Sequence, residues 1–170
     1  LQEGEFGSIT EEQREALSII LQKSQKLADL VEDIVSVQAL ETQTYDRKPV
    51  NINEIINEAL RRNEQRAREA GVTFEPRLPS NMPMVMADSK SIVEVMDKLI
   101  DNAIKFGATG GKVEVVVQNT NGPLVQVAIR DYGIGIDASE HHKIFQRFYQ
   151  VDGGTARRYA GTGLGLAIAK

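Results

Sequence analysis

Three short stretches decide how this sequence is interpreted: residues 101–106 (DNAIKF), 131–136 (DYGIGI) and 161–166 (GTGLGL). Glycines at alternate positions let a backbone bend sharply and approach a ligand closely. The second glycine motif leads into a predicted helix, and the free amides at a helix start suit a phosphate group. Either glycine motif alone is equally compatible with a flexible turn, because short glycine patterns are common.

The first stretch adds two polar side chains on one helical face. Asn102 and Lys105 are three residues apart, so they occupy neighbouring positions on the helix surface. An amide oxygen is a hard ligand that suits Mg²⁺, and lysine offers a compact cation for phosphate. Taken alone, the pair is better described as an ordinary solvated helix face.

Two other phosphate-binding folds are disfavoured. Neither glycine motif has the Gly-Lys-Ser or Gly-Lys-Thr ending of a P-loop. The strand–loop–helix repeats that build a dinucleotide-binding parallel sheet are missing from the pattern as well.

The amino-acid composition limits which classes of protein this chain can belong to. The 170 residues suffice for one compact domain with an appendage, and 41% hydrophobic with 26% charged residues is ordinary for a globular protein. A net charge of -4 without a basic stripe argues against a nucleic-acid partner. The chain has no cysteine, no membrane-length apolar run and no signal peptide, so we expect a cytoplasmic location, while the parent protein can still be membrane-anchored.

Residues 10–42 are predicted to form one long helix. Thr10 and Gln13 have the spacing of a capping box. Apolar residues then recur at alternating spacings of three and four, which is typical of a bundle helix; they are Leu17, Ile20, Leu27, Val31 and Ile34. A helix of about 30 residues extends about 45 Å and cannot bury this stripe alone. We therefore expect it to associate with a second copy or with a helix upstream of this sequence.

Arg47-Lys48-Pro49 breaks the helical pattern and marks the boundary of a second region with mixed elements. Strands are predicted at residues 50–52, 72–77, 84–86, 112–118 and 124–130, the last two as a hairpin across Asn121-Gly122. Helices are predicted from caps at Asn53 and Asp88, at 139–148 and from Leu164 onward. The apolar side of the helix after Asp88 is predicted to contain Ile92, Val95, Met96, Leu99, Ala103 and Phe106. The predicted class is α+β, with helices layered on a mostly antiparallel sheet.

Taken in order, residues 102–106, 131–136, 144–150 and 161–166 resemble the four boxes of histidine kinases. These kinases share an ATP-binding superfamily with gyrase, mismatch-repair and heat-shock chaperone ATPases. The long helix is similar to the second helix of the family's dimerisation and histidine-phosphotransfer hairpin. The resemblance implies a Bergerat-type two-layer sandwich over residues 47–170, preceded at 1–46 by a partial phosphotransfer region that lacks its first helix.

The resemblance also implies roles for individual residues, with ATP and Mg²⁺ as cofactors. Asn102 would hold the Mg²⁺, Lys105 would contact phosphate, and Asp131 would accept a hydrogen bond from the adenine amino group. The other implied nucleotide contacts are Phe106, Gly133, Gly135, Ile136, Tyr149, Arg158, Gly161, Thr162, Gly163, Leu164, Gly165 and Leu166.

The resemblance further makes residues 150–163 a mobile ATP lid. Phe145, Phe148 and Tyr149 would form an aromatic hinge for it. Plain core packing is an equally good interpretation of Phe145 and Phe148.

Three features depart from the family pattern. The acceptor histidine is missing, because His141 and His142 lie before the lid and are expected at the surface. Lys98 stands one turn before Asn102, where family members usually have Asn and the related ATPases have a water-activating Glu; it is either a solvent-facing charge or an extra phosphate contact. The sequence ends at Lys170, before the strand pair that normally completes the fold, so we expect C-terminal truncation.

The leading functional hypothesis is the catalytic core of a sensor histidine kinase. Its partners would be ATP, the receiver domain of a response regulator, and a second copy bound through the long helix. The alternatives are a non-catalytic nucleotide-sensing module, which the missing histidine and Lys98 favour, and a gyrase-like ATPase, which Lys98 disfavours.

Overall fold

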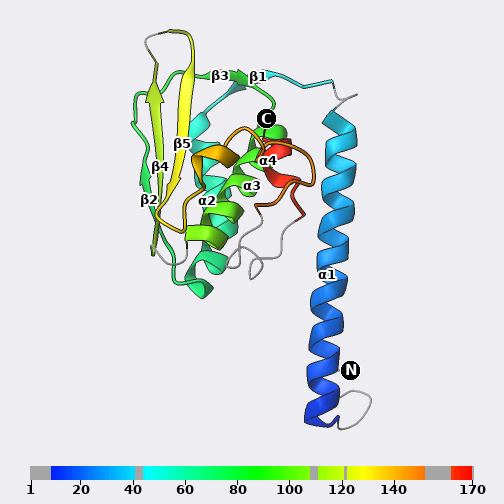
Figure 1. The fold of residues 1–170 in the computed structure, drawn as a ribbon. Helices are drawn as coiled ribbons and strands as arrows, with labels where there is room; N and C mark the ends of the chain where they lie inside the picture. Colours follow the sequence, from blue (N-terminus) through cyan, green and yellow to red (C-terminus); the bar gives the residue numbers. More distant parts are fainter. Residues whose placement is uncertain (1–8, 41–43, 108–110, 121, 152–161, 170) are drawn as a thin grey trace.

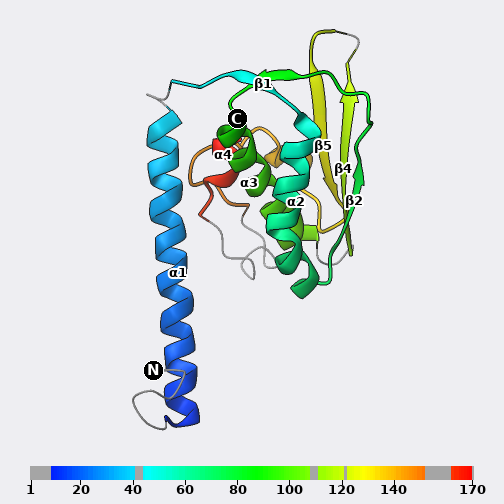
Figure 2. The ribbon, with the colours of Figure 1, turned by 180° about the vertical axis from the view of Figure 1, so that it is seen from behind.

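The computed structural model describes residues 9–40, 44–107, 111–120, 122–151 and 162–169. A long helix, α1 (Glu11–Leu40), stands beside a layered unit formed by the other elements (Figure 1). In that unit, helices α2 (Ile52–Glu69) and α3 (Ser89–Gly107) cover one face of a sheet, and the short helix α4 (Gly165–Ile168) lies between α3 and α1. Figure 2 shows the same order from behind. The predicted α+β class with helices layered on a sheet is confirmed.

The main sheet has the order β2-β4-β5. Its strands are β2 (Thr73–Arg77), β4 (Lys112–Asn119) and β5 (Val125–Asp131). The β2–β4 pair is parallel, with Thr73 beside Lys112, and the β4–β5 pair is antiparallel, with Val113 beside Asp131. Strands β1 (Lys48–Val50) and β3 (Val85–Ala87) form a separate antiparallel pair. The strands on either side of the 79–83 turn therefore belong to different sheets.

The core lies between the sheet and the two long helices of the layered unit. Val113, Val115 and Val117 alternate along β4 and are at most 1% exposed, as expected for the inward face of a strand with a period of two. Ile56 of α2 and Ile100 of α3 are fully buried against them. Each such side chain stabilises the fold by about 1.5–3 kcal/mol relative to exposure.

Helix α1 begins as predicted. The backbone N–H of Thr10 donates to Oε1 of Gln13 at 2.9 Å, and the N–H of Gln13 donates to Oγ1 of Thr10 at 3.2 Å, which is the predicted capping box. Its apolar stripe is largely uncovered: Leu21 is 60% exposed and Leu27 is 61% exposed. Among the described side chains of α1, Leu30 packs against Leu164 and Ile168 of the α4 segment.

Three predictions of local structure were wrong. Strand β1 ends at Val50, and Asn51, instead of Asn53, caps α2 by accepting from the N–H of Asn53 at 3.0 Å. The side chain of Asn53 instead donates to the carbonyl of Pro79 at 2.8 Å, which ties α2 to the loop before β3. Residues 139–148 form only a 3₁₀ turn, Ala138–Glu140, followed by further turns. The closely spaced polar residues there, with Asp137 accepting from Ser139, favour turns over a continuous helix.

Helix α3 begins where predicted, and its buried face overlaps the predicted one only in part. Asp88 caps it by accepting from the N–H of Ser91 at 3.1 Å. Met96 and Ala103 are buried as predicted. The other predicted residues, Ile92, Val95, Leu99 and Phe106, are only half-buried, and Val93, Ile100 and Ile104 are buried instead. Apolar residues surround much of this helix, so periodicity alone identified only part of the side that meets the sheet. None of the helices in the described ranges combines the length and apolar character needed to cross a membrane.

Candidate functional site

The middle of α3 faces the second glycine motif. An ideal Cβ placed on Gly165 would lie 3.6 Å from Nδ2 of Asn102 and 3.8 Å from Cβ of Lys98. Asn102 and Lys98 are one helical turn apart, so both face the start of α4. The structure therefore brings together Asn102 and Gly165, which are 63 positions apart in the sequence.

The end of α3 meets the first glycine motif. An ideal Cβ on Gly133 would fall 1.7 Å from the carbonyl oxygen of Phe106, so only glycine fits there. The N–H of Ile134 donates to that same carbonyl at 3.3 Å. Gly135 has φ +69°, the left-handed region that glycine adopts without a steric cost. Both glycine motifs are thus seated on one helix, at its middle and at its end.

Asp131, the last residue of β5, is positioned by its own loop. Its Oδ1 accepts from the N–H of Gly133 at 3.0 Å, and its side chain is exposed. An ideal Cβ on Gly107 would lie 2.9 Å from Cβ of Asp131, so the end of α3 also packs against this side chain. The carboxylate retains acceptor capacity beyond the bond to Gly133.

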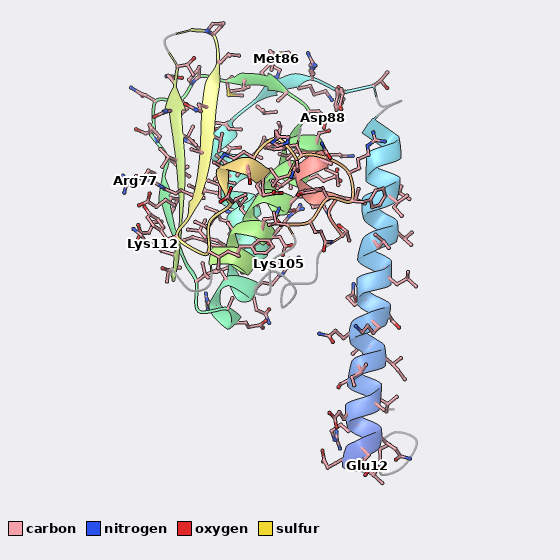
Figure 3. The ribbon with its side chains drawn as sticks, viewed as in Figure 1. Glu12, Arg77, Met86, Asp88, Lys105 and Lys112 are labelled. Atoms are coloured by element: carbon pink, nitrogen blue, oxygen red, sulfur yellow. The ribbon has the colours of Figure 1, made fainter. Side chains whose placement is uncertain are left out.

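Lys105 is held in an ion-pair network that the sequence analysis missed. Its Nζ lies 2.8 Å from Oδ2 of Asp101, one turn earlier on α3, and Asp101 also pairs with Arg66 of α2. Lys105 is one-third exposed, on the side of the sheet that carries the helices (Figure 3). Its i,i+4 spacing from Asp101 was visible in the sequence, but the arginine from α2 depends on the tertiary fold.

The second glycine motif is fixed by a backbone contact at Phe148. The N–H of Phe148 donates to the carbonyl of Gly163 at 2.9 Å. An ideal Cβ on Gly163, which has φ +73°, would lie 2.8 Å from the carbonyl carbon of Phe148. Phe148 itself has φ +63°, an uncommon conformation for a residue with a side chain. Thr162 adds a turn contact, since its Oγ1 accepts from the N–H of Leu164 at 3.3 Å.

The aromatic residues near this motif are not in the core. Phe145 is 41% exposed and Phe148 is 62% exposed, so core packing is ruled out for both. Tyr149 is half-buried, and its hydroxyl donates to the carboxylate of Glu140. The hydrogen bond to Glu140 raises the pKa of Tyr149, and the same bond lowers the pKa of Glu140.

The other predicted residues take varied positions. Leu164 is fully buried in a small apolar cluster with Ile168 and Leu30, while Leu166 is half-buried. Ile136 is 46% exposed, and its carbonyl lies 3.2 Å from a ring nitrogen of His141. His141 and His142 are exposed. Arg158, Gly161 and most of the predicted lid lie outside the described residues.

The charged side chains on the main sheet form a separate group, away from this site. Figure 3 shows Arg77 and Lys112 on the main sheet, away from α4. There Lys112 lies 3.2 Å from Glu75 and from Glu114, and Glu114 also pairs with Arg77. In the described part of the chain, no three His, Cys, Asp or Glu side chains gather as a metal site would require.

Comparisons with known proteins match this arrangement. Residues 87–170 match the family described as histidine kinase-, DNA gyrase B- and HSP90-like ATPases. The sensor protein kinase WalK of Staphylococcus haemolyticus is 34% identical over 157 residues, which are 91% of this chain and 26% of that protein. The circadian input-output histidine kinase CikA of Synechococcus elongatus is 31% identical over 169 residues, 97% of this chain and 22% of that protein. The chain thus spans about a quarter of these relatives.

Solved structures agree with the sequence relatives. Full-length ShkA, solved in complex with AMPPNP, superposes with a TM-score of 0.78 at 26% identity and covers 97% of this chain and 34% of that one. The mycobacterial sensor histidine kinase MprB gives a TM-score of 0.60 at 31% identity and covers 72% of this chain and 75% of that one. The chain therefore belongs to the histidine kinase-, DNA gyrase B- and HSP90-like ATPase family, and it carries an ATP-binding domain of the histidine kinase type.

Proposed function

We propose that this chain is the catalytic core of a sensor histidine kinase that binds ATP with Mg²⁺. The observation that carries the proposal is the seating of both glycine motifs on α3, with Gly133 against Phe106 and Gly165 beside Asn102. A backbone without side chains at these points can approach a ligand closely. The AMPPNP bound to ShkA, a neighbour of the same fold, supports a nucleotide as that ligand.

In this proposal each residue of the site contacts a different part of the bound nucleotide. Asp131 accepts from the adenine amino group, with its carboxylate oriented by the N–H of Gly133. Asn102 supplies the protein oxygen for Mg²⁺, which takes its other ligands from phosphates and water. Lys105 contacts phosphate through its ammonium group, which would keep its ion pair with Asp101 at the same time. Bound Mg²⁺ would neutralise charge that develops on the phosphates during transfer.

The other predicted ATP contacts, apart from the Tyr149 side chain, are also proposed. Gly163 and Gly165 would act through their backbone, and Leu164 can act only in that way because its side chain is fully buried. Thr162 and Leu166 flank them. Phe106 and Ile136 would border the base, and Arg158 and Gly161 are carried over from the family pattern alone.

Titration of nucleotide by calorimetry, with and without Mg²⁺, tests the binding proposal. We expect the unaltered chain to bind ATP more tightly with Mg²⁺, and Asn102→Ala to weaken that binding by about tenfold or more, since a polar contact to a charged group is lost. Asn57→Ala, which removes an exposed amide on α2, is the matched control and should bind normally. Equal affinities of Asn102→Ala and the unaltered chain would contradict the assignment.

The phosphoryl group would pass to a histidine outside this chain and then to an aspartate of a response-regulator receiver domain in the cytoplasm. Incubation of the longer parent protein with γ-labelled ATP separates this from nucleotide sensing alone. Acid-labile label on the protein supports the kinase, and binding without label supports the non-catalytic alternative. We expect negligible phosphate release from the chain alone, because Lys98 cannot activate water while it is protonated.

Residues 1–46 are proposed as a separate helical region that pairs with a second copy, and residues 47–170 as the ATP-binding domain. The exposed stripe on α1, which includes Ile20, Leu27 and Val31, supports pairing. Sedimentation tests it: Leu27→Asp should shift the chain toward monomer, whereas the exposed polar position Gln22→Asp should not. A monomeric unaltered chain at all concentrations would count against it.

A further inference from the structure

Glu140 and Tyr149 close a short loop that precedes the predicted lid. The hydroxyl of Tyr149 donates to one oxygen of the Glu140 carboxylate. Nζ of Lys143 lies 3.1 Å from the other oxygen and 5.9 Å from the centre of the Tyr149 ring. The Glu140 side chain is only 18% exposed, so this contact is sheltered from water. A charged acceptor makes the hydrogen bond stronger than a neutral one.

The end of this loop, at Phe148 and Tyr149, contacts the backbone of Gly163. Phe148 precedes Tyr149, adopts φ +63°, and donates its N–H to the carbonyl of Gly163 at 2.9 Å. An ideal Cβ on Gly163 would come within 3.0 Å of the carbonyl oxygen of Tyr149. A left-handed conformation at a phenylalanine persists only where its surroundings hold it. The neighbouring Tyr149 is anchored by Glu140, and that anchor supplies such a constraint.

The contacts continue from Gly163 to the middle of α3. Gly165, two residues later, packs beside Asn102. We propose that Glu140 is a positioning residue for nucleotide binding, which anchors Tyr149 so that the second glycine motif lies against Asn102. This inference rests on the proposed nucleotide site. In this inference the Tyr149 hydroxyl serves as a partner of Glu140 and not as the nucleotide contact that the family resemblance implied.

Four variants test this pair: Tyr149→Phe, Glu140→Ala, Glu140→Gln and the double variant Tyr149→Phe with Glu140→Ala. The measurement is the affinity for a fluorescent ATP analogue in the presence of Mg²⁺. Tyr149→Phe and Glu140→Ala should each weaken binding by about threefold to tenfold. The double variant should bind no more weakly than the weaker single variant, because all three break the same Tyr149–Glu140 bond. Glu140→Gln keeps an acceptor oxygen and should restore most of the affinity.

Two further measurements keep this inference separable from the proposed function. Hydrogen exchange at the Phe148 amide should be faster in Tyr149→Phe than in the unaltered chain, whether or not nucleotide is present. Tyr45→Phe, at an exposed tyrosine of the segment before β1, is the matched control and should change neither exchange nor affinity.

The outcomes that overturn the inference are distinct. If the unaltered chain binds the analogue but Tyr149→Phe and Glu140→Ala bind it equally well, Glu140 has no positioning role. Additive losses in the double variant would also overturn it. If the unaltered chain binds no nucleotide, the proposed function fails, and unchanged exchange at Phe148 would then show separately that the anchor fails.

Discussion

Helices α1 and α3 are both amphipathic, but they use their apolar residues differently. On α3, Ile100 is fully buried and Ile104 is 5% exposed, because α2 and the sheet cover that side. On α1, Ile20 is 60% exposed and Leu27 is 61% exposed. The same helical periodicity thus marks a completed interface in one helix and an uncovered one in the other. Periodicity identifies an apolar side, but the surrounding chain decides whether it is buried.

The sharpest test of this difference is the removal of one isoleucine from each helix. Ile100→Ala should lower the free energy of unfolding by about 4 kcal/mol, because it leaves a cavity in the core. Ile20→Ala is the matched change on α1 and should alter unfolding of the layered unit by less than about 0.5 kcal/mol. Urea denaturation followed by circular dichroism measures both, and similar losses at the two positions would show that α1 contributes to the stability of the layered unit.

A second test compares two glycines of the loop seated on α3. Gly133→Ala should destabilise the fold by about 3 kcal/mol, because the new methyl group meets the carbonyl oxygen of Phe106. Gly135→Ala introduces the same group at φ +69° but into open space, so we expect a cost of only about 1 kcal/mol. Thermal unfolding ranks the two variants, and the reverse ranking would contradict the packing of this loop.

Helix caps offer a third comparison. Asn51→Ala removes the cap of α2 and should cost about 1 kcal/mol in the unfolding of the layered unit. Thr10→Ala removes the cap of α1, and it should reduce the helicity of α1 without changing that unfolding transition. Circular dichroism reports the helicity and urea denaturation the stability. If Thr10→Ala shifts the unfolding transition as Asn51→Ala does, α1 unfolds together with the rest of the chain.

The smallest expected effect is a pH dependence at the joint between the two regions. Asp88 accepts from the N–H of Ser91 on α3 and from the N–H of Asp46 in the segment after α1. These bonds, with that from Ser91 the largest cause, lower the pKa of Asp88. The carboxylate therefore stabilises the fold above the unfolded-state pKa, about 3.9, and this contribution is lost as pH falls through the lower folded-state pKa.

The matched variant for this joint is Asp88→Asn, whose amide oxygen can still accept but does not titrate. Its unfolding midpoint should fall less steeply than that of the unaltered chain below about pH 4. Urea midpoints between pH 6 and pH 3 measure the difference. If the midpoints of the two proteins fall in parallel with pH, Asp88 does not contribute to the acid sensitivity of the fold.

The sequence predicted the parts of the fold that depend on local patterns. The capping box at Thr10, the cap at Asp88 and the β4–β5 hairpin are confirmed because neighbouring residues determine them. The separation of β2 and β3 into different sheets depends on long-range pairing, which no local pattern contains. Likewise, two asparagines stood near the start of α2, and only the backbone geometry shows that Asn51 is the cap.

The candidate site divides in the same way. Asn102 and the two glycine motifs were recognisable from their order along the chain, but the sequence could not show that both motifs rest on α3. It also missed Glu140 and Arg66, because each acts through a partner that only the fold brings near. Leu164 was predicted to contact the nucleotide, but its side chain is buried with Ile168, which leaves only its backbone for such a contact.

The parallel pairing of β2 with β4 also has a kinetic consequence. The hairpin of β4 and β5 needs only a short turn, whereas β2 reaches β4 after the chain has passed through β3 and α3. Parallel neighbours require such a crossover, and contacts distant in sequence form slowly because a long loop must close first. We expect the hairpin to form early and β2 to join it late. The helix on which both glycine motifs rest lies within that crossover, so the ligand site should be among the last parts of the molecule to be completed.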